Sequence, residues 1–118
     1  MTITIYHNPK CSTARQVLQA LQEAGWQPTV VDYLKSPPSV ATLRALAQKM
    51  PRPHDLLRTK EPLYKTLSLS PEPSVDEVAN LLHEHPVLLN RPICETPTFA
   101  MAVRPSAAVS TFLERLQK

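Results

Sequence analysis

The sequence predicts an α/β fold in which helices cover both faces of a mixed, four-stranded sheet. Residues 2–6 alternate polar and β-branched apolar side chains, as in a strand, and helical apolar spacing follows directly. Residues 28–33 form a second strand pattern, and two short strand segments near the C terminus flank a turn at residues 96–98. With 118 residues and 42% hydrophobic content, the chain is expected to form one domain over residues 1–118.

The first half of the chain alternates strand and helix patterns. Gly25 follows the first helical pattern as a left-handed C-terminal cap. The order strand, helix, strand predicts a right-handed crossover between two parallel strands. A second helix is expected to end at Pro51, and Pro62 divides residues 55–67 into two short helical pieces. The apolar positions of the first two helices are Ala14, Val17, Leu18 and Leu21, then Val40, Leu43, Leu46, Ala47 and Met50.

The second half continues with a helix, a hairpin and a last helix. Ser74 and Glu77 fit a capping box, so a helix is expected there that ends near residue 85. Residues 93–95 and 99–103 are close enough in sequence to form an antiparallel hairpin. Pro105 suits the first position of the last helix. This order of elements is typical of a thioredoxin-like fold with a helical insertion between the second strand and the C-terminal hairpin.

Composition excludes several classes of function. The thirteen basic and ten acidic residues are scattered, and the few aromatic residues form no stacking platform, so nucleic acid is not expected as a partner. A single glycine argues against a nucleotide-binding loop. No apolar run approaches the roughly 20 residues that a membrane-spanning helix needs. The chain has two cysteines and no apolar leader, which favours the reducing cytoplasm.

Cys11 is the main candidate for chemistry because it stands where a strand ends and a helix begins. A helix N-terminus has unpaired N–H groups and a partial positive charge, and both stabilise a thiolate. His7, Lys10 and Arg15 are expected to add positive charge and to lower the pKa of Cys11 further. A buried, inert cysteine is the alternative, but a polar turn is a poor core environment.

The same turn is suited to an oxyanion, and arginine side chains would complete such a site. Arginine donates paired hydrogen bonds to tetrahedral oxyanions and stays charged. Arg58, Arg91 and Arg104 all lie near proline-marked boundaries, where strands or helices are expected to end. Taken singly, each of them is more commonly a solvated surface charge than a ligand.

Residues 5–15, Ile-Tyr-His-Asn-Pro-Lys-Cys-Ser-Thr-Ala-Arg, resemble the active-site segment of glutaredoxin-coupled arsenate reductases. Further blocks recur in the same order at residues 32–38, 57–62, 85–93 and 103–106, so the resemblance covers almost the whole chain. It implies a thioredoxin-like fold in which the Arg91-Pro92 peptide bond is cis.

The resemblance also implies a reaction and its residues. Cys11 would attack arsenate and displace water, with His7 helping to keep the thiolate. Glutathione would then join the adduct, glutaredoxin would resolve it, and arsenite would leave. No bound metal or organic cofactor is implied. The oxyanion-binding residues would be Arg58, Arg91 and Arg104, with Asn8, Ser12, Arg15 and Pro92 in supporting positions.

Two departures from the family pattern keep other functions open. Ala14 stands where well-studied members have serine, and the chain ends at Lys118 without the longer tail of some members. A glutathione-dependent thiol oxidoreductase of another substrate is one alternative. Redox-responsive regulators that bind RNA polymerase are another, but their sensor is a Cys-x-x-Cys pair, which Ala14 interrupts. Thiol phosphatases and related reductases need Cys-x5-Arg, and position 17 is valine.

The second cysteine and the histidines are weaker candidates. Cys94 lies two residues after the expected cis proline, where it is either a resolving thiol or, more commonly, a small core residue. His54, His83 and His85 have no spacing that pairs them as metal ligands.

Overall fold

A computed structural model of the chain describes residues 2–116 and has at its centre a mixed, four-stranded sheet in the order β2-β1-β3-β4. The central strand β1 runs parallel to β2 and antiparallel to β3, which pairs antiparallel with the edge strand β4. The predicted parallel start and antiparallel hairpin are therefore both confirmed. The strands span Thr4–His7 in β1, Thr29–Asp32 in β2, Ile93–Glu95 in β3 and Ala100–Ala102 in β4.

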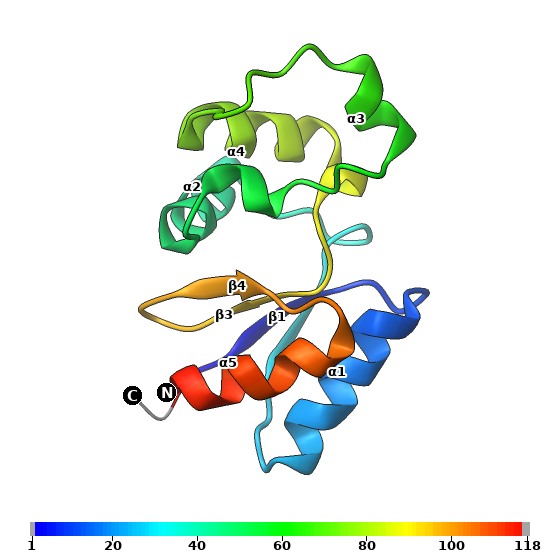
Figure 1. Cartoon of the computed structure of the whole chain (residues 1–118), viewed down its shortest axis with the longest axis vertical. Helices are drawn as coiled ribbons and strands as arrows, with labels where there is room; N and C mark the ends of the chain where they lie inside the picture. The colour runs from blue at the N-terminus through cyan, green and yellow to red at the C-terminus, as the bar shows by residue number, and fades with distance from the viewer. Residues whose placement is uncertain (1, 117–118) are drawn as a thin grey trace.

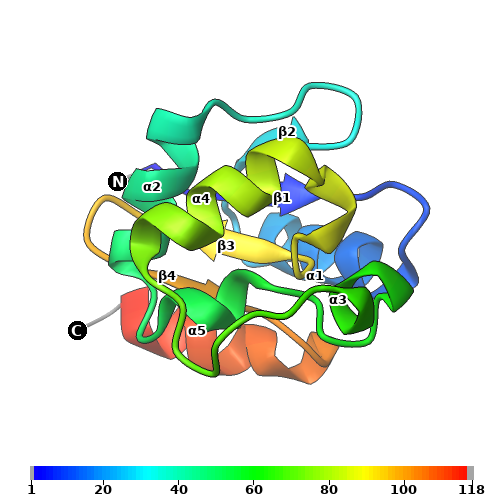
Figure 2. The ribbon, with the colours of Figure 1, turned by 90° about the horizontal axis from the view of Figure 1, so that it is seen from above.

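Helices lie on both faces of the sheet, as predicted (Figure 1). The first and last helices, α1 and α5, lie on one face, and α2 and α4 cover the other (Figures 1 and 2). The short helix α3 belongs to the inserted segment and lies beyond the end of β1 at which the turn to α1 begins (Figure 2). The helices span Ser12–Glu23 in α1, Val40–Lys49 in α2, Pro62–Thr66 in α3, Val75–Glu84 in α4 and Val109–Leu116 in α5.

The ends of α1 and α4 follow from local sequence signals. Gly25 after α1 has a φ of 93°, the left-handed conformation predicted for its position, and an added Cβ would be strained there. Before α4, the Ser74 hydroxyl accepts from the Glu77 amide at 3.1 Å. The Glu77 carboxylate accepts in turn from the Ser74 amide at 3.3 Å, which completes the predicted capping box.

The proline-rich segments confirm one prediction and correct another. Residues 53–67 contain two short helical pieces, a 3₁₀ turn at Pro53–Leu56 and α3. Pro105 was expected to open the last helix, but its ψ of 176° is extended and it precedes a 3₁₀ turn at Ser106–Ala108. Its carbonyl accepts from the Ala108 amide at 2.8 Å, so Pro105 caps the turn instead of belonging to α5.

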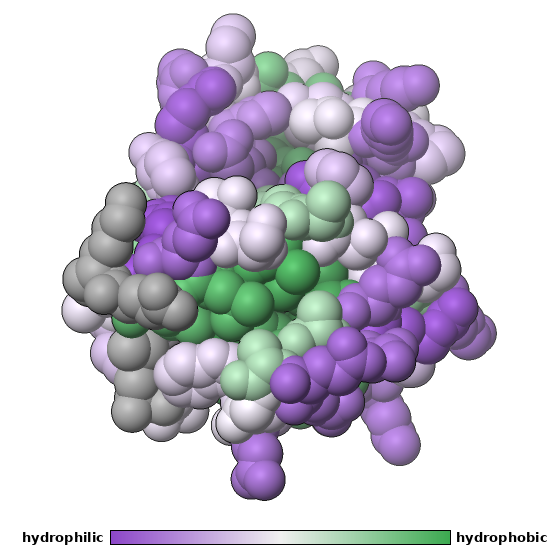
Figure 3. All heavy atoms as spheres, turned by 60° about the horizontal axis from the view of Figure 1, so that its bottom comes forward, coloured by the Kyte–Doolittle hydropathy of each residue, from purple (hydrophilic) through white to green (hydrophobic). Residues whose placement is uncertain are grey.

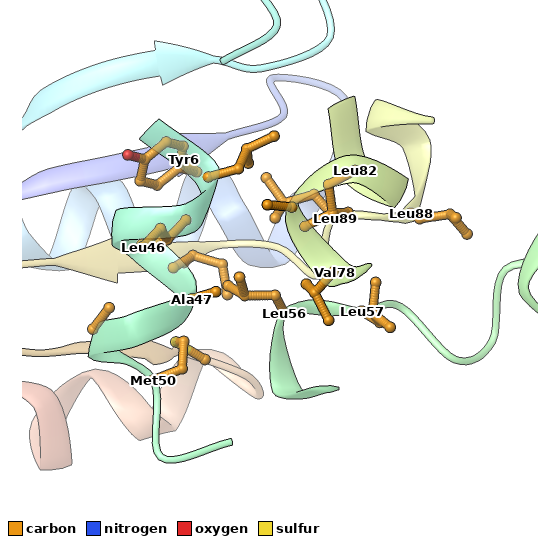
Figure 4. Close-up of a cluster of buried hydrophobic side chains, with 14 of the residues drawn as sticks. Tyr6, Leu46, Ala47, Met50, Leu56, Leu57, Val78, Leu82, Leu88 and Leu89 are labelled. Atoms are coloured by element: carbon orange, nitrogen blue, oxygen red, sulfur yellow. The ribbon is translucent and has the colours of Figure 1, made fainter. Parts of the chain in front are cut away.

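Two apolar clusters, one on each side of the sheet, form the core. The first lies between the sheet and α2 and α4 (Figure 4). The second lies between the sheet and α1 and α5, and on that side apolar residues also reach the surface inside a polar border (Figure 3). Residues that are fully buried in the second cluster include Ile5, Val17, Leu21, Cys94, Val103 and Phe112.

Part of the insertion pairs with the segment that leads into β3. Leu57 forms an antiparallel bridge with Leu89. The Arg58 amide donates to the Leu88 carbonyl at 2.7 Å, and the Asn90 amide donates to the Leu56 carbonyl, also at 2.7 Å. This pairing fixes Arg58 close to Asn90, at the end of the sheet where β3 begins.

Candidate active site

The predicted reactive groups gather at one end of the sheet. β1 ends there, and because β3 is antiparallel to β1 and β4 to β3, β3 begins and β4 ends at the same place (Figures 1 and 2). The turn that contains Cys11 follows β1, Arg91 precedes β3, and Arg104 follows β4. Residues that are far apart in sequence therefore come together around one thiol.

Cys11 is the N-cap residue of α1, with φ −93° and ψ 120°. Asn8 builds the turn before it, since its carbonyl accepts from the Cys11 amide at 2.9 Å and its Oδ1 accepts from the Lys10 amide at 2.9 Å. Asn8 is almost fully buried, so this turn is rigidly placed. The Cys11 side chain remains partly exposed at the helix N-terminus.

The environment of Cys11 favours the thiolate. Partial burial alone would raise the pKa of this thiol, but the backbone N–H of Ala14 and the side chains of Arg91 and Arg104 outweigh that effect. Together they lower the pKa of Cys11 from 9.0 to about 7. The main contributions come from the helix N-terminus and from the two arginines, and not from His7, Lys10 or Arg15 as the sequence suggested. About half of the thiol is ionised at neutral pH.

Arg91 and Arg104 form a pair beside the thiol. Arg104 Nη1 lies 3.7 Å from Cys11 Sγ and donates to the Arg91 carbonyl at 2.6 Å. The Arg91 Nε–H is buried and has no hydrogen-bond partner among residues 2–116, so it is available to an anion. The Arg91-Pro92 bond is cis, which confirms the prediction, and the Arg104-Pro105 bond is cis as well.

Arg58 approaches the same place from the insertion. Together with Arg104, Lys60 and Asn90, it lines a cavity of about 220 Å³. Its guanidinium forms a salt bridge with the carboxylate of Glu61, three residues later, at 3.0 Å. Arg91 and Arg104 thus lie at the sulfur, and Arg58 shares a cavity with Arg104.

His7 is placed at the site but differs in charge from the expectation. It is the last residue of β1, pairs in register with Asp32, and is 6% exposed. Burial lowers the pKa of His7 and Arg15 lowers it further, while Asp32 acts in the opposite direction. The imidazole is therefore mainly neutral at pH 7, and its Nδ1 has no hydrogen-bond partner among the described residues.

The remaining predicted residues have scaffolding positions. Arg15 Nη1 donates to the Pro9 carbonyl at 2.7 Å, which ties the turn to the first turn of α1. Ser12 is exposed at the first position of that helix. Pro92, which follows Arg91, is buried, and its carbonyl accepts from the Val103 amide at 3.0 Å. Pro92 thereby joins the start of β3 to the end of β4.

Cys94 is a core residue, and the histidines join no cluster of metal-ligating side chains in the described part of the chain. The Cys94 thiol is fully buried in the cluster under α1 and α5, and burial raises its pKa to about 12. Among residues 2–116, no three histidine, cysteine or acidic side chains come together as a set of metal ligands. None of the helices in the same range is long and apolar enough to cross a membrane.

Tyr33 is a residue of this site that sequence reasoning did not single out. Its side chain is fully buried and its hydroxyl has no hydrogen-bond partner of normal geometry in residues 2–116. Burial raises the pKa of this phenol, and its polar neighbours Arg91 and Asn8 offset that effect in part, so the hydroxyl remains a donor. The only indication in the sequence that Tyr33 belongs to the site was its position directly after β2, inside the family-like segment at residues 32–38.

Replacing Tyr33 with phenylalanine tests what this hydroxyl does. A buried hydroxyl without a partner destabilises the ligand-free protein, so Tyr33→Phe should raise the free energy of unfolding by up to about 1 kcal/mol. We also expect a severalfold higher KM for an oxyanion substrate, because the hydroxyl is next to Arg91, where an oxyanion would bind. Urea denaturation and steady-state kinetics measure the two effects. A variant that is less stable and has an unchanged KM would contradict both expectations.

Comparison with known proteins identifies the family of this chain. A sequence model of the ArsC family matches residues 6–112. The chain belongs to the ArsC family. An arsenate reductase of Rhizobium meliloti (strain 1021) is 41% identical to this ArsC protein over 120 residues, which cover 100% of this chain and 86% of the relative. An arsenate reductase of Escherichia coli is 38% identical and covers 98% of this chain and 84% of its own length.

A solved structure shows the same fold as this ArsC chain. The arsenate reductase from Vibrio cholerae has a TM-score of 0.82 at 38% identity, over 94% of this chain and 97% of that one. The ArsC match at residues 6–112 includes Cys11 and all three arginines of the site. The resemblance stated from the sequence is therefore confirmed for both family and fold.

Proposed function

We propose that this ArsC protein is a cytoplasmic arsenate reductase in which Cys11 is the nucleophile and glutathione and glutaredoxin supply the electrons. The observation on which this rests most is a thiol with a pKa of about 7 between two guanidinium groups. A thiolate is the reactive form of cysteine, and guanidinium groups bind tetrahedral oxyanions. The full-length relatives named arsenate reductase support the choice of arsenate.

The reaction begins with arsenate held by Arg58, Arg91 and Arg104. The Cys11 thiolate forms a bond to arsenic, and one arsenate oxygen takes up protons and leaves as water. The arginines stabilise the negative charge on the remaining oxygens throughout. His7 is buried and mainly neutral at pH 7, so it does not act as a fixed cation beside the thiolate. Asn8 and Arg15 hold the turn through hydrogen bonds, with Ser12 at the start of α1. Pro92 joins the start of β3 to the end of β4.

The second half of the reaction needs thiols from outside the chain. Reduction of arsenic from +5 to +3 takes two electrons, which are released when two thiols become one disulfide. Cys94 is a poor partner because it is buried and its pKa is about 12. Glutathione therefore forms a second sulfur–arsenic bond on the Cys11 adduct, and another arsenate oxygen leaves as water. A glutaredoxin thiol then attacks the glutathione sulfur, which forms a glutathione–glutaredoxin disulfide and leaves its electron pair on arsenic, now at +3. Water finally displaces Cys11 from arsenic, so that arsenite leaves and the Cys11 thiol is restored.

Measuring arsenite tests the proposal directly. Purified protein with arsenate, glutathione and glutaredoxin should produce arsenite in many turnovers, and leaving out glutathione should stop the reaction. Leaving out glutaredoxin should reduce turnover to the slow rate at which glutathione alone resolves the adduct. If the complete mixture forms no arsenite above the protein-free background, the protein is not an arsenate reductase. Thiol exchange on a disulfide substrate would then point to the alternative, a thiol oxidoreductase of another substrate.

A further inference from the structure

A second and larger cavity adjoins the active-site cavity. It has a volume of about 490 Å³, within the range of cavities that hold small organic ligands. Leu57, Thr59 and Asn90 line both cavities, so the two adjoin one another. Arg104, which lines the smaller cavity, lies 3.7 Å from Cys11 Sγ. A ligand that extends from the larger cavity into the smaller one therefore approaches the nucleophile through Arg104, although arsenate itself is too small to need this space.

The larger cavity contains one fixed positive and one negative group. The Arg115 guanidinium lies over the Phe99 ring at 4.1 Å from its centroid, which orients it before any ligand binds. Asp55, in the 3₁₀ turn at Pro53–Leu56, lines the same cavity. Within residues 2–116, neither Arg115 nor Asp55 forms a salt bridge. Two unpaired opposite charges in one cavity match a zwitterionic ligand better than a simple anion.

The floor of the cavity includes the free edge of the sheet. Strand β4 is the edge strand, and Ala102 lines the cavity. The residues on either side of Ala102 face β3: the Val103 amide donates to the Pro92 carbonyl, and Met101 pairs with Cys94. Because backbone groups alternate in direction along an antiparallel strand, the N–H and C=O groups of Ala102 point to the free edge. They are available to the amide groups of a peptide ligand.

We propose that this cavity binds the γ-glutamyl end of glutathione and directs its thiol toward Cys11. The inference rests on the proposed function, in which glutathione attacks the arsenic adduct. The α-carboxylate of the γ-glutamyl group binds Arg115, its ammonium group binds Asp55, and its amide lies along Ala102. Neither of the two charged residues was singled out in the sequence, and Arg115 lies outside the residues that the ArsC model matches.

The reach of glutathione fits this placement. Arg115 Nη1 lies 4.0 Å from Met101 Sδ, and both residues line the cavity. From Met101 to Arg104 the chain advances three residues, or about 10 Å when extended. The γ-glutamyl α-carbon and the thiol of glutathione are separated by a similar distance, about 9 Å in an extended chain. The thiol of a bound molecule consequently lies at the arginine pair beside Cys11.

Kinetics of charge-neutral variants test the assignment. Arg115→Gln and Asp55→Asn should each raise KM for glutathione about tenfold, as expected for the loss of one charge-assisted hydrogen bond. The turnover number at saturating glutathione, KM for arsenate and the pKa of Cys11 should not change. Arg52→Gln and Asp76→Asn are matched controls, because both residues are in exposed salt bridges outside the cavity and should leave KM for glutathione unchanged. Circular dichroism checks that each variant is folded.

A truncated thiol and an unreactive analogue separate this inference from the proposed function. Cysteinylglycine lacks the γ-glutamyl group, so wild type and Arg115→Gln should use it with the same KM. S-methylglutathione cannot react, and we expect it to bind wild type about tenfold more tightly than Arg115→Gln in calorimetry. Unchanged values for both variants, in an enzyme that produces arsenite, would overturn the inference and leave the function intact. Wild type that binds S-methylglutathione as expected but forms no arsenite would support the cavity assignment and refute the reductase.

Discussion

Replacing Cys11 with serine should abolish arsenite formation while the protein stays folded. A serine hydroxyl is not ionised at neutral pH and cannot replace the thiolate, so we expect turnover to fall by at least about 10³-fold. The fold should tolerate this change well. Cys11 is the N-cap of α1, and serine is one of the preferred N-cap residues because its oxygen accepts from the amides of the first turn. Arsenite assays and thermal unfolding measure both effects.

Cys94→Ser is the matched control for this experiment, since it makes the same chemical change at the other cysteine. Cys94 is fully buried, and a hydroxyl without a partner there should cost about 1–3 kcal/mol in the free energy of unfolding. Turnover per folded molecule should nevertheless equal that of wild type. The opposite result, an active Cys11→Ser or a folded but inactive Cys94→Ser, would mean that the reacting thiol has been assigned to the wrong residue.

Local sequence signals predicted the scaffold of the site well. The change from strand to helix spacing after residue 6, the glycine after α1 and the capping box before α4 all depend on residues within a few positions of one another. Such signals are visible in a single sequence because the interactions that they describe are local. The start of the last helix was misplaced, since proline suits a capping position outside a helix as well as the first position inside it.

The electrostatics of the site could not be derived in the same way. The sequence suggested that neighbours of Cys11 would supply the positive charge, but Arg15 is turned to the Pro9 carbonyl and His7 is buried and mainly neutral. The charge comes instead from Arg91 and Arg104, which are 80 or more positions away. They reach Cys11 only because β3 begins and β4 ends at the end of the sheet where β1 ends. Burial decides such effects, and burial depends on the whole fold.

Family resemblance supplied what local reasoning lacked. It indicated the three arginines together. In the structure Arg91 and Arg104 act on the Cys11 thiol, and Arg58 shares a cavity with Arg104. Features that depend on precise packing were still missed, among them the unpartnered hydroxyl of Tyr33. The cavity between Asp55 and Arg115 was missed for the same reason, since no spacing in the sequence indicates that these two residues face one space.

Replacing Arg91 with glutamine should have the second largest effect on activity. Arg91 lowers the pKa of Cys11 through both hydrogen bonding and charge, so its loss should raise that pKa from about 7 by about one unit. The thiolate fraction at pH 7 would then fall about fivefold. Arsenate would also lose a charge-assisted hydrogen-bond partner, which costs at least about tenfold in binding. We expect kcat/KM at pH 7 to fall about 10²-fold as the product of the two effects.

The pH dependence of thiol alkylation separates these two effects. Iodoacetamide is uncharged and reacts with the thiolate, so its rate should rise with pH through the pKa of Cys11, with a midpoint of about 7 in wild type. In Arg91→Gln the midpoint should move to higher pH, and the difference between the two proteins should therefore be large below pH 7 and vanish above pH 9. Arg15→Gln removes the same charge four residues from Cys11 but should keep the wild-type midpoint, because Arg15 is held at the Pro9 carbonyl. Equal midpoints in wild type and Arg91→Gln would show that Arg91 acts on arsenate alone and that the helix N-terminus and Arg104 suffice to form the thiolate.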